Sequence, residues 1–190
     1  MSQAFETIYP ALNEALRTRF STVVAIDGPC ASGKTTLAET LRARFGARVI
    51  PMDDFFLPQA LRTPVRYGTP GGNVHYERFL EEIAPSLCPD QIGKVLSYLP
   101  FDCKTMSFRP RRQIPWSPLT VVEGSYSLHD ALRHLYDIRI FLSVDAREQE
   151  RRILSREGPE GLAVFLERWI PLENLYFNAV HPERFCDFIL

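Results

Sequence analysis

The pattern of apolar and polar positions alternates between short, β-branched runs and longer stretches in which apolar residues recur at helical spacing. Continuous apolar runs are typical of buried strands, and spacings of three and four positions are typical of amphipathic helices. Strand-like runs lie at 21–26, 47–52, 119–122, 138–144 and 186–190. Helix-like stretches lie at 9–19, 37–45, 76–87, 128–135, 146–156 and 162–169, the last bent or broken near Pro171. Strands that alternate with helices predict an α/β fold whose mostly parallel sheet is covered on both faces.

Three segments have no clear period. Segment 55–73 is rich in Pro, Gly and Arg, and we interpret it as a long functional loop because regular patterns resume on both sides. Segment 94–101 is predicted to be a strand or an extended stretch, and 109–118 to be irregular and basic. A length of 190 residues without an internal repeat predicts one domain over 1–190, with a helix inside 1–20 that precedes the first strand.

The run DGPCASGKTT, over 27–36, joins the first predicted strand to the next predicted helix. It has the spacing of the phosphate-binding loop of nucleoside triphosphatases and kinases, and the flanking strand and helix argue against a chance match. Glycines let the backbone curl around an anion, so that N–H groups and the positive helix end point at phosphate oxygens. Lys34 brings a positive charge to the β- and γ-phosphates, and Thr35 offers a hydroxyl to Mg²⁺. The predicted nucleotide-binding residues are Gly28, Pro29, Cys30, Ala31, Ser32, Gly33, Lys34, Thr35 and Thr36.

Composition and charge argue against several other classes of protein. A net charge of −1 disfavours a broad nucleic-acid-binding surface. No apolar stretch approaches the length of a membrane span, and the first residues lack the basic start and apolar core of a secretory signal. We therefore expect a cytoplasmic protein without nucleic-acid or membrane partners. The oligomeric state is left open, a homo-oligomer included.

The four cysteines, Cys30, Cys88, Cys103 and Cys186, lack the paired spacing of a metal site and are interpreted as reduced, structural residues. Cys30 is an exception because it lies inside the phosphate loop, where helix N–H groups are expected to lower its pKa. A thiol reagent is therefore expected to inactivate the protein, and bound ATP to protect it.

Asp53 and Asp54 follow the second predicted strand, in the run MDDFFLP. Ligands of open parallel sheets bind beyond the carboxyl ends of the strands, so a carboxylate here can face the γ-phosphate. Its two candidate roles are to accept a proton from an attacking hydroxyl or to ligate Mg²⁺. The alternative is a pair of solvated turn residues or helix caps, which the adjacent Phe55 and Phe56 disfavour. We predict a function for at least one of the two aspartates.

A second acid and a pair of arginines complete the candidate site. Glu123 ends an apolar strand, as does the acid that supports Mg²⁺ in phosphate-loop enzymes. Asp145 is its rival, but the residues after it are typical of a helix start, so Asp145 is predicted to be a helix cap. Arg152 and Arg156 lie on one helical face before a Gly-Pro turn, which suits a cationic lid over phosphates. A solvated basic helix face fits the same spacing.

Taken in order, these features resemble the uridine kinase-like branch of phosphate-loop small-molecule kinases, which also includes pantothenate kinase, phosphoribulokinase and nicotinamide riboside kinase. The likeness runs from Val23 onward and rests on DGPCASGKTT, MDDFF, VVEG and the arginine-rich RRILSR. The phosphate loop is shared with many families, whereas an early Asp-Asp-Phe with a later Glu-Gly is more specific. The resemblance implies a P-loop NTPase fold, in which a five-stranded parallel sheet is flanked by helices on both faces and a helical lid carries arginines.

The resemblance also implies transfer of the γ-phosphate of ATP to a substrate hydroxyl. Asp53 matches the catalytic base of the family, and Thr35 and Glu123 match its Mg²⁺ site, which Asp53 also borders. Arg152 and Arg156 fall where the lid arginines of the family lie. The expected catalytic residues are Asp53, Lys34, Arg152 and Arg156, and the expected Mg²⁺ ligands are Thr35, Asp53 and Glu123.

The acceptor region departs from the uridine kinase pattern. Those enzymes carry an acidic residue before His-Pro in the segment that corresponds to 72–75, where this chain has no acid. Their Tyr-Asp motif, followed by a histidine, corresponds here to Phe101-Asp102, with Met106 near the place of the histidine. Such a site is expected to bind a nucleoside poorly, because its polar edges would lose water without gaining partners.

The sequence therefore predicts a kinase that uses ATP and Mg²⁺ to phosphorylate a hydroxyl of a small nucleoside or vitamin-like metabolite. The cluster Arg109, Arg111 and Arg112 is interpreted mainly as a solvated basic loop. A regulatory ATPase without a small-molecule acceptor is the alternative function. The predicted acceptor-binding residues are Asp54, Tyr76, Phe101, Asp102 and Arg109.

Overall fold

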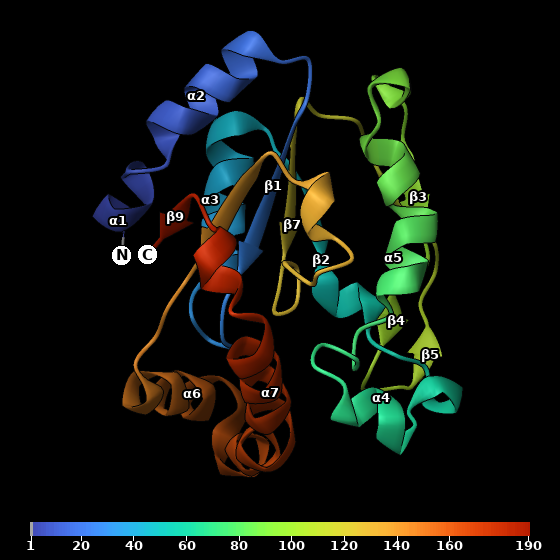
Figure 1. Ribbon diagram of the computed structural model, residues 1–190, viewed down its shortest axis with the longest axis vertical. Helices are drawn as coiled ribbons and strands as arrows, with labels where there is room; N and C mark the ends of the chain where they lie inside the picture. Colours follow the sequence, from blue (N-terminus) through green and yellow to red (C-terminus); the bar gives the residue numbers. More distant parts are fainter. Residues whose placement is uncertain (1) are drawn as a thin grey trace.

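A five-stranded, all-parallel sheet forms the centre of the computed structural model, which describes residues 2–190 (Figure 1). The strand order is β2-β7-β1-β8-β9. The strands are β1 (Thr22–Asp27), β2 (Arg48–Pro51), β7 (Leu119–Glu123), β8 (Ile138–Phe141) and β9 (Phe188–Ile189). Each predicted strand-like run contributes one strand, so the predicted five-stranded parallel sheet is confirmed.

Buried side chains on the two faces of the sheet belong to two separate clusters. Along β1, Val24 and Ile26 pack with the N-terminal helices, whereas Val23 and Ala25 belong to the opposite face. Figure 1 shows α2 and α3 on one side of the strands and α5 on the other. Because both faces are covered, all six positions of β1 are buried, as in a strand of a doubly covered parallel sheet. The helices involved are α1 (Ser2–Glu6), α2 (Tyr9–Thr18), α3 (Lys34–Phe45), α5 (Tyr76–Glu82) and α7 (Ile170–Val180).

Segment 55–73, predicted to be a loop, contains a 3₁₀ turn (Gln59–Leu61) and the short helix α4 (Pro64–Gly68). The helix begins where the Thr63 hydroxyl accepts the Arg66 backbone N–H, and Pro64 fits the first turn because its missing N–H needs no partner there. A helix as short as α4 does not produce a recognisable period of apolar positions in the sequence.

Segment 109–118 is not wholly irregular, which corrects the prediction. It contributes β6 (Arg112–Ile114), which pairs antiparallel with β3 (Leu96–Tyr98). A second small ladder joins β4 (Phe101–Asp102) to β5 (Ser107–Phe108). The formation of such short strands depends on pairing with a partner strand, so the local sequence pattern does not predict them.

The predicted helices over 76–87 and 128–135 are shorter than expected. The first ends at Glu82, and Pro85 lacks the N–H that would continue it. The second contains only a 3₁₀ turn. The 3₁₀ turns not yet given are Met52–Phe55, Ala84–Leu87, Pro89–Gln91, Arg133–Leu135 and Pro182–Phe185. Within residues 2–190, no helix has the length and apolar character that crossing a bilayer requires.

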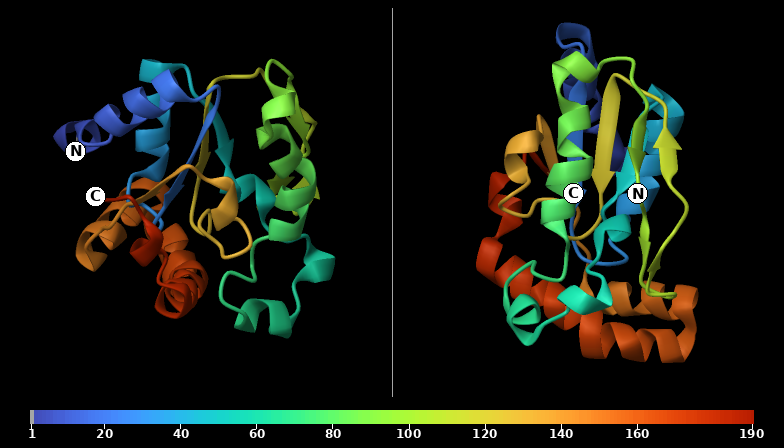
Figure 2. Two further views of the ribbon diagram at one scale, coloured as in Figure 1. Left: turned by 45° about the horizontal axis from the view of Figure 1, so that its top comes forward. Right: turned by 90° about the vertical axis from the view of Figure 1, so that its right-hand side faces the viewer.

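A helical arm, residues 146–180, lies beyond the carboxyl ends of the central strands (Figures 1 and 2). It consists of α6 (Ala146–Val164), a π-helical stretch (Phe165–Trp169) and α7. Gly158 has φ 74° and ψ −179°, far from helical values, so the arm is kinked at the predicted Gly-Pro turn. Pro171 lies in the first turn of α7, where a proline is tolerated.

Candidate active site

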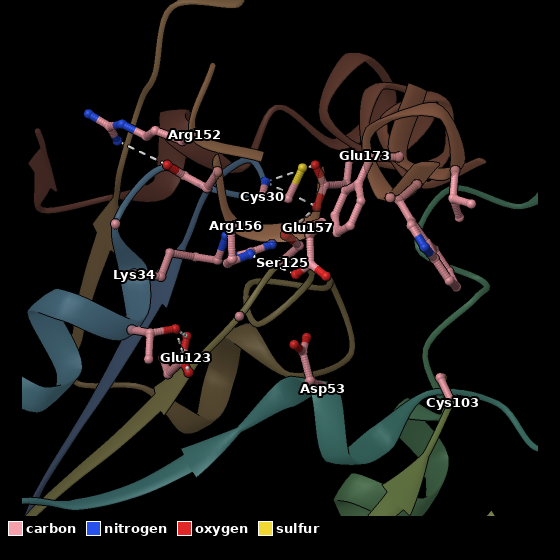
Figure 3. A pocket seen from close by; sticks show the side chains of 18 of the residues that line it. Cys30, Lys34, Asp53, Cys103, Glu123, Ser125, Arg152, Arg156, Glu157 and Glu173 are labelled. Carbon is pink, nitrogen blue, oxygen red and sulfur yellow. Dashed lines mark hydrogen bonds and ion pairs between the residues drawn. The ribbon is translucent and has the colours of Figure 1, made fainter. Parts of the chain in front are cut away.

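A cavity of about 780 Å³ lies between the phosphate loop, the end of β7 and the arm (Figure 3). Figure 3 shows Lys34, Asp53 and Glu123 bordering the same space from three different elements. The predicted site residues in its lining are Cys30, Ala31, Gly33, Lys34, Thr35, Thr36, Asp53, Glu123, Arg152 and Arg156. Residues from four distant segments therefore meet in a space of the size that small-molecule sites have.

Two glycines give the phosphate loop its shape. Gly28 has φ 139°, and a Cβ at this position would lie 2.1 Å from the Leu142 carbonyl oxygen, so no larger residue fits. Gly33, with φ 108°, directly precedes α3. The Lys34 ammonium donates to the carbonyl oxygens of Gly28 and Pro29, at 2.7 Å each. The helix N-terminus and this ammonium together form a cradle for an anion.

Asp27, the first residue of the run DGPCASGKTT, was not predicted to have a role, but its hydrogen bonds anchor the phosphate loop. Its carboxylate accepts the Gly28 N–H at 2.7 Å, and the Tyr126 and Leu128 N–H groups of the segment after β7 at 3.1 and 2.9 Å. The Tyr176 hydroxyl of α7 donates to it at 2.9 Å. Complete burial raises the pKa of Asp27 to about 6, although these hydrogen bonds lower it.

The two adjacent aspartates have different surroundings. Asp53 is accessible to water inside the cavity, yet the surrounding protein limits its hydration and raises its pKa, an effect that the Lys34 ammonium opposes. Asp54 does not line the cavity. Its carboxylate accepts the Tyr98 hydroxyl at 2.7 Å and an Arg112 N–H at 2.9 Å. The geometry therefore favours Asp53 over Asp54 as the base, a role that stays a prediction.

Thr35 and Glu123 present a pair of oxygen atoms to the cavity. The Thr35 hydroxyl lies 3.3 Å from Oε1 of Glu123, and burial together with the nearby Asp53 raises the pKa of Glu123 to about 7. Hydroxyl and carboxylate oxygens suit Mg²⁺, which commonly keeps waters and takes the rest of its ligands from substrate phosphates. No group of three His, Cys, Asp or Glu side chains in residues 2–190 could hold a cation alone. The residues present thus fit a magnesium ion that arrives with a nucleotide.

Asp145, the rival of Glu123, is the N-cap of α6. Its carboxylate accepts the backbone N–H groups of Arg147 and Glu148 at 2.9 and 3.3 Å. The prediction that Asp145 caps a helix is confirmed.

Both arginines of the predicted lid line the cavity. Arg152 donates to the Ala31 carbonyl oxygen of the phosphate loop at 2.9 Å and to the Glu148 carboxylate at 2.7 Å. Arg156 donates to Glu157 at 2.8 Å. The arm therefore brings two guanidinium groups to the cavity, and their action on a phosphate stays a prediction.

The remaining predicted acceptor residues do not line the cavity. Tyr76 stacks on His129, with ring centroids 4.3 Å apart, and Phe101 is buried in its hairpin. Asp102 and Arg109 pair with each other at 2.7 Å. The ion pair satisfies the charged groups of Asp102 and Arg109, and the structure brings none of these four side chains to the cavity.

Other side chains form the cavity wall that faces Asp53. Phe56 and Trp169 contact each other there, with ring centroids 5.7 Å apart, and Ser125 and Glu173 lie nearby. The pair of aromatic residues after Asp54 was the available sequence signal for Phe56. Trp169 and Glu173 carried none, because a helical pattern does not show which face of the arm meets the cavity.

The expectation that the phosphate loop lowers the pKa of Cys30 is wrong. Burial and the neighbouring Glu173 carboxylate raise the pKa of this thiol to about 12. Its backbone N–H donates to that carboxylate, so the group expected to favour a thiolate is already engaged.

Comparison with known proteins agrees with this architecture. No protein-family model matches the chain. Over 124 residues it is 29% identical to uridine-cytidine kinase C of Dictyostelium discoideum, a match that covers 64% of this chain and 26% of that protein. The matched part of the chain thus spans about a quarter of the length of this curated relative.

Two solved structures share the fold over nearly their whole length. A possible uridine kinase from Bacillus stearothermophilus superposes with a TM-score of 0.74 at 19% identity and covers 100% of this chain and 98% of its own. A candidate fructose transport system kinase from Silicibacter sp. TM1040 has a TM-score of 0.69 at 24% identity and covers 98% of each chain. The predicted P-loop NTPase fold and the resemblance to uridine kinase-like proteins are confirmed.

Proposed function

We propose that this protein is an ATP-dependent kinase that transfers the γ-phosphate of ATP to a hydroxyl of a small metabolite. One observation carries the proposal: the phosphate loop with Lys34 and the carboxylate of Asp53 line the same cavity. The similarity to uridine-cytidine kinase C supports it. A loop that holds a triphosphate and an acid that faces it are the two parts that transfer to an alcohol requires.

Nucleotide binding is assigned to the loop and the start of α3. Backbone N–H groups and the Lys34 ammonium would hold the β- and γ-phosphates. Thr35 and Glu123, with Asp53 opposite, would hold Mg²⁺, which neutralises phosphate charge when bound. The Lys34 ammonium donates to two loop carbonyl oxygens, and these bonds hold it at the cradle.

The chemical step needs positioning more than covalent participation, because the transition state of phosphoryl transfer is loose. The acceptor oxygen bonds to the γ-phosphorus while the bond from that phosphorus to the bridging oxygen of ADP breaks. Asp53 orients the acceptor hydroxyl and takes its proton late. Arg152 and Arg156 of the arm would stabilise the charge on the transferring group.

A measurement of ATP turnover in the presence of Mg²⁺ tests the proposal. We expect slow ADP formation until the correct alcohol is added from a panel of nucleosides, vitamins and sugar alcohols, with a phosphorylated product visible by mass spectrometry. Lys34→Ala should abolish transfer and leave the fold intact. ATP hydrolysis that no member of a broad panel stimulates would instead favour a regulatory ATPase.

A further inference from the structure

Glu173 of α7 places a buried carboxylate against the phosphate loop (Figure 3). Its side chain is only 5% exposed. Its two oxygens accept the backbone N–H of Cys30 at 2.9 and 3.1 Å, and Oε1 also accepts the Ser125 hydroxyl at 2.6 Å. The carboxylate therefore lies on the cavity wall, between the tip of the loop and the segment that follows β7.

If Glu173 has only a structural role, burying its negative charge costs free energy that a neutral side chain would not cost. In the described residues 2–190, both of its hydrogen-bond donors are neutral and no Lys, Arg or His forms an ion pair with it. Burial removes much of its hydration, and a polyanion bound at the loop would repel it. A glutamine would accept the Cys30 N–H without that cost.

Glu173 also borders the space that an acceptor would occupy. Figure 3 shows Glu173 and Asp53 on opposite sides of the cavity. Limited hydration is the main cause of the raised pKa of Asp53. The positive charge of Lys34 lowers this pKa, whereas the negative charge of Glu173 raises it further. An ionised carboxylate only accepts hydrogen bonds and has about four lone-pair sites, so the contacts with Cys30 and Ser125 leave capacity toward the cavity. A ligand that fills this capacity must be a donor.

We propose that Glu173 binds the acceptor, by accepting a hydrogen bond from a second hydroxyl or an amino group while Asp53 orients the hydroxyl to be phosphorylated. This inference rests on the proposed kinase function and specifies its substrate class. The acceptors are alcohols that carry a further hydrogen-bond donor, and an anionic group at that position is excluded. A site with a buried acceptor group rejects a ligand that lacks the donor, because the group then stays unpaired.

The test compares the wild-type protein with Glu173→Gln and Glu173→Ala. Gln can still accept the Cys30 N–H, and Glu167→Gln is the control, because Glu167 is exposed on the same arm and does not line the cavity. The probes are pairs of alcohols that differ by one hydroxyl: ribonucleosides against their 2′-deoxy and 3′-deoxy forms, and pyridoxine against 4-deoxypyridoxine. The measured quantities are kcat/KM for each probe, the calorimetric Kd of MgATP and the melting temperature.

For at least one pair, we expect the wild-type protein and Glu167→Gln to prefer the alcohol with the extra hydroxyl by roughly ten- to a hundred-fold. Glu173→Gln should reduce this preference to a few-fold and Glu173→Ala should remove it, with the Kd of MgATP unchanged or lower, because the repulsion between Glu173 and the bound polyanion is gone. If both Glu173 variants keep the preference and instead weaken ATP binding or lower the melting temperature, Glu173 only anchors the loop, and the inference is wrong although the kinase function stands. If the wild-type protein binds ATP but phosphorylates no alcohol, the proposed function fails and the inference fails with it.

Discussion

At the scale of the residue, Asp53 and Asp54 differ because a tight turn separates them. The 3₁₀ turn Met52–Phe55 sends successive side chains in different directions. Asp53 meets the cavity, whereas Asp54 joins a network with Tyr98 and Arg112. This network connects β3 and β6 to the turn that follows β2, so Asp54 contributes to structure, whereas Asp53 is the aspartate that lines the cavity.

Substitution of the two aspartates should separate these roles. Asp53→Asn should lower kcat by roughly 10²- to 10⁴-fold, the usual contribution of a positioned base, with little change in melting temperature. Asp54→Asn should leave kcat within a few-fold but lower the melting temperature, because it weakens the bonds to Tyr98 and Arg112. Steady-state kinetics and thermal unfolding of both variants check this, and the reverse ranking of kcat would assign the base to Asp54.

Cys30 provides a second prediction at this scale. With a pKa of about 12, on the order of one Cys30 thiol in 10⁴ is ionised at pH 8, and the thiolate is the reactive form. Iodoacetamide should therefore modify the exposed Cys88 long before Cys30, and modification of Cys88 should not inactivate the protein. Peptide mass spectrometry over a time course measures both rates. Equal labelling of the two cysteines would show that the phosphate loop activates its thiol after all.

At the scale of the element, the sequence predicted those features that depend on residues close together in the chain. The central strands follow from apolar runs, the phosphate loop from one motif, and Asp53 from its place just after a strand. The strand β6 depends on pairing with β3, and Glu173 reaches the loop only through the packing of the arm. Tyr76 and Asp102 have polar groups like those of a binding site, but they contact His129 and Arg109, partners that a local pattern does not show.

The kink in the arm provides the prediction for this scale. Gly158 combines φ 74° with ψ −179°, a conformation nearly restricted to glycine, and a Cβ there would meet no atom within 4 Å. Gly158→Ala should therefore act through backbone strain alone. We expect it to straighten the arm and shift Arg156, lowering kcat several-fold while the melting temperature falls by only a few degrees.

The matched control for this variant is Ser155→Ala, at an exposed helical position of the same element that does not line the cavity. Alanine suits a helix at least as well as serine, so this change adds no backbone strain. Kinetics of the two variants side by side decide the matter: a loss of kcat common to both would indicate general damage to α6 and not a requirement for the kink.

At the scale of the whole molecule, Asp27 joins three parts of the chain that are distant in sequence. Its carboxylate receives the Gly28 N–H of the phosphate loop, two N–H groups of the segment after β7 and the Tyr176 hydroxyl of α7. The buried carboxylate of Asp27 thereby connects α7 of the arm to the phosphate loop. The stability of the fold and the position of the arm should both depend on the ionisation of this group.

The pH dependence of unfolding tests the role of Asp27. Its pKa is about 6 in the folded protein, against 3.8 for the ordinary side chain, because burial outweighs four hydrogen bonds. Between these values the folded state binds more protons than the unfolded state, so the free energy of unfolding should fall as pH rises through this window, by up to about 3 kcal/mol.

The variant Asp27→Asn isolates this effect, because its side chain does not titrate. The contributions of the other titrating groups cancel when the free energy of unfolding of the variant is subtracted from that of the wild-type protein. We expect this variant to be less stable throughout, because the amide cannot accept all four hydrogen bonds. The gap to the wild-type protein, measured by denaturant unfolding, should narrow between pH 4 and pH 7. A gap that widens instead would mean that the four donors outweigh burial and hold the pKa of Asp27 below its ordinary value.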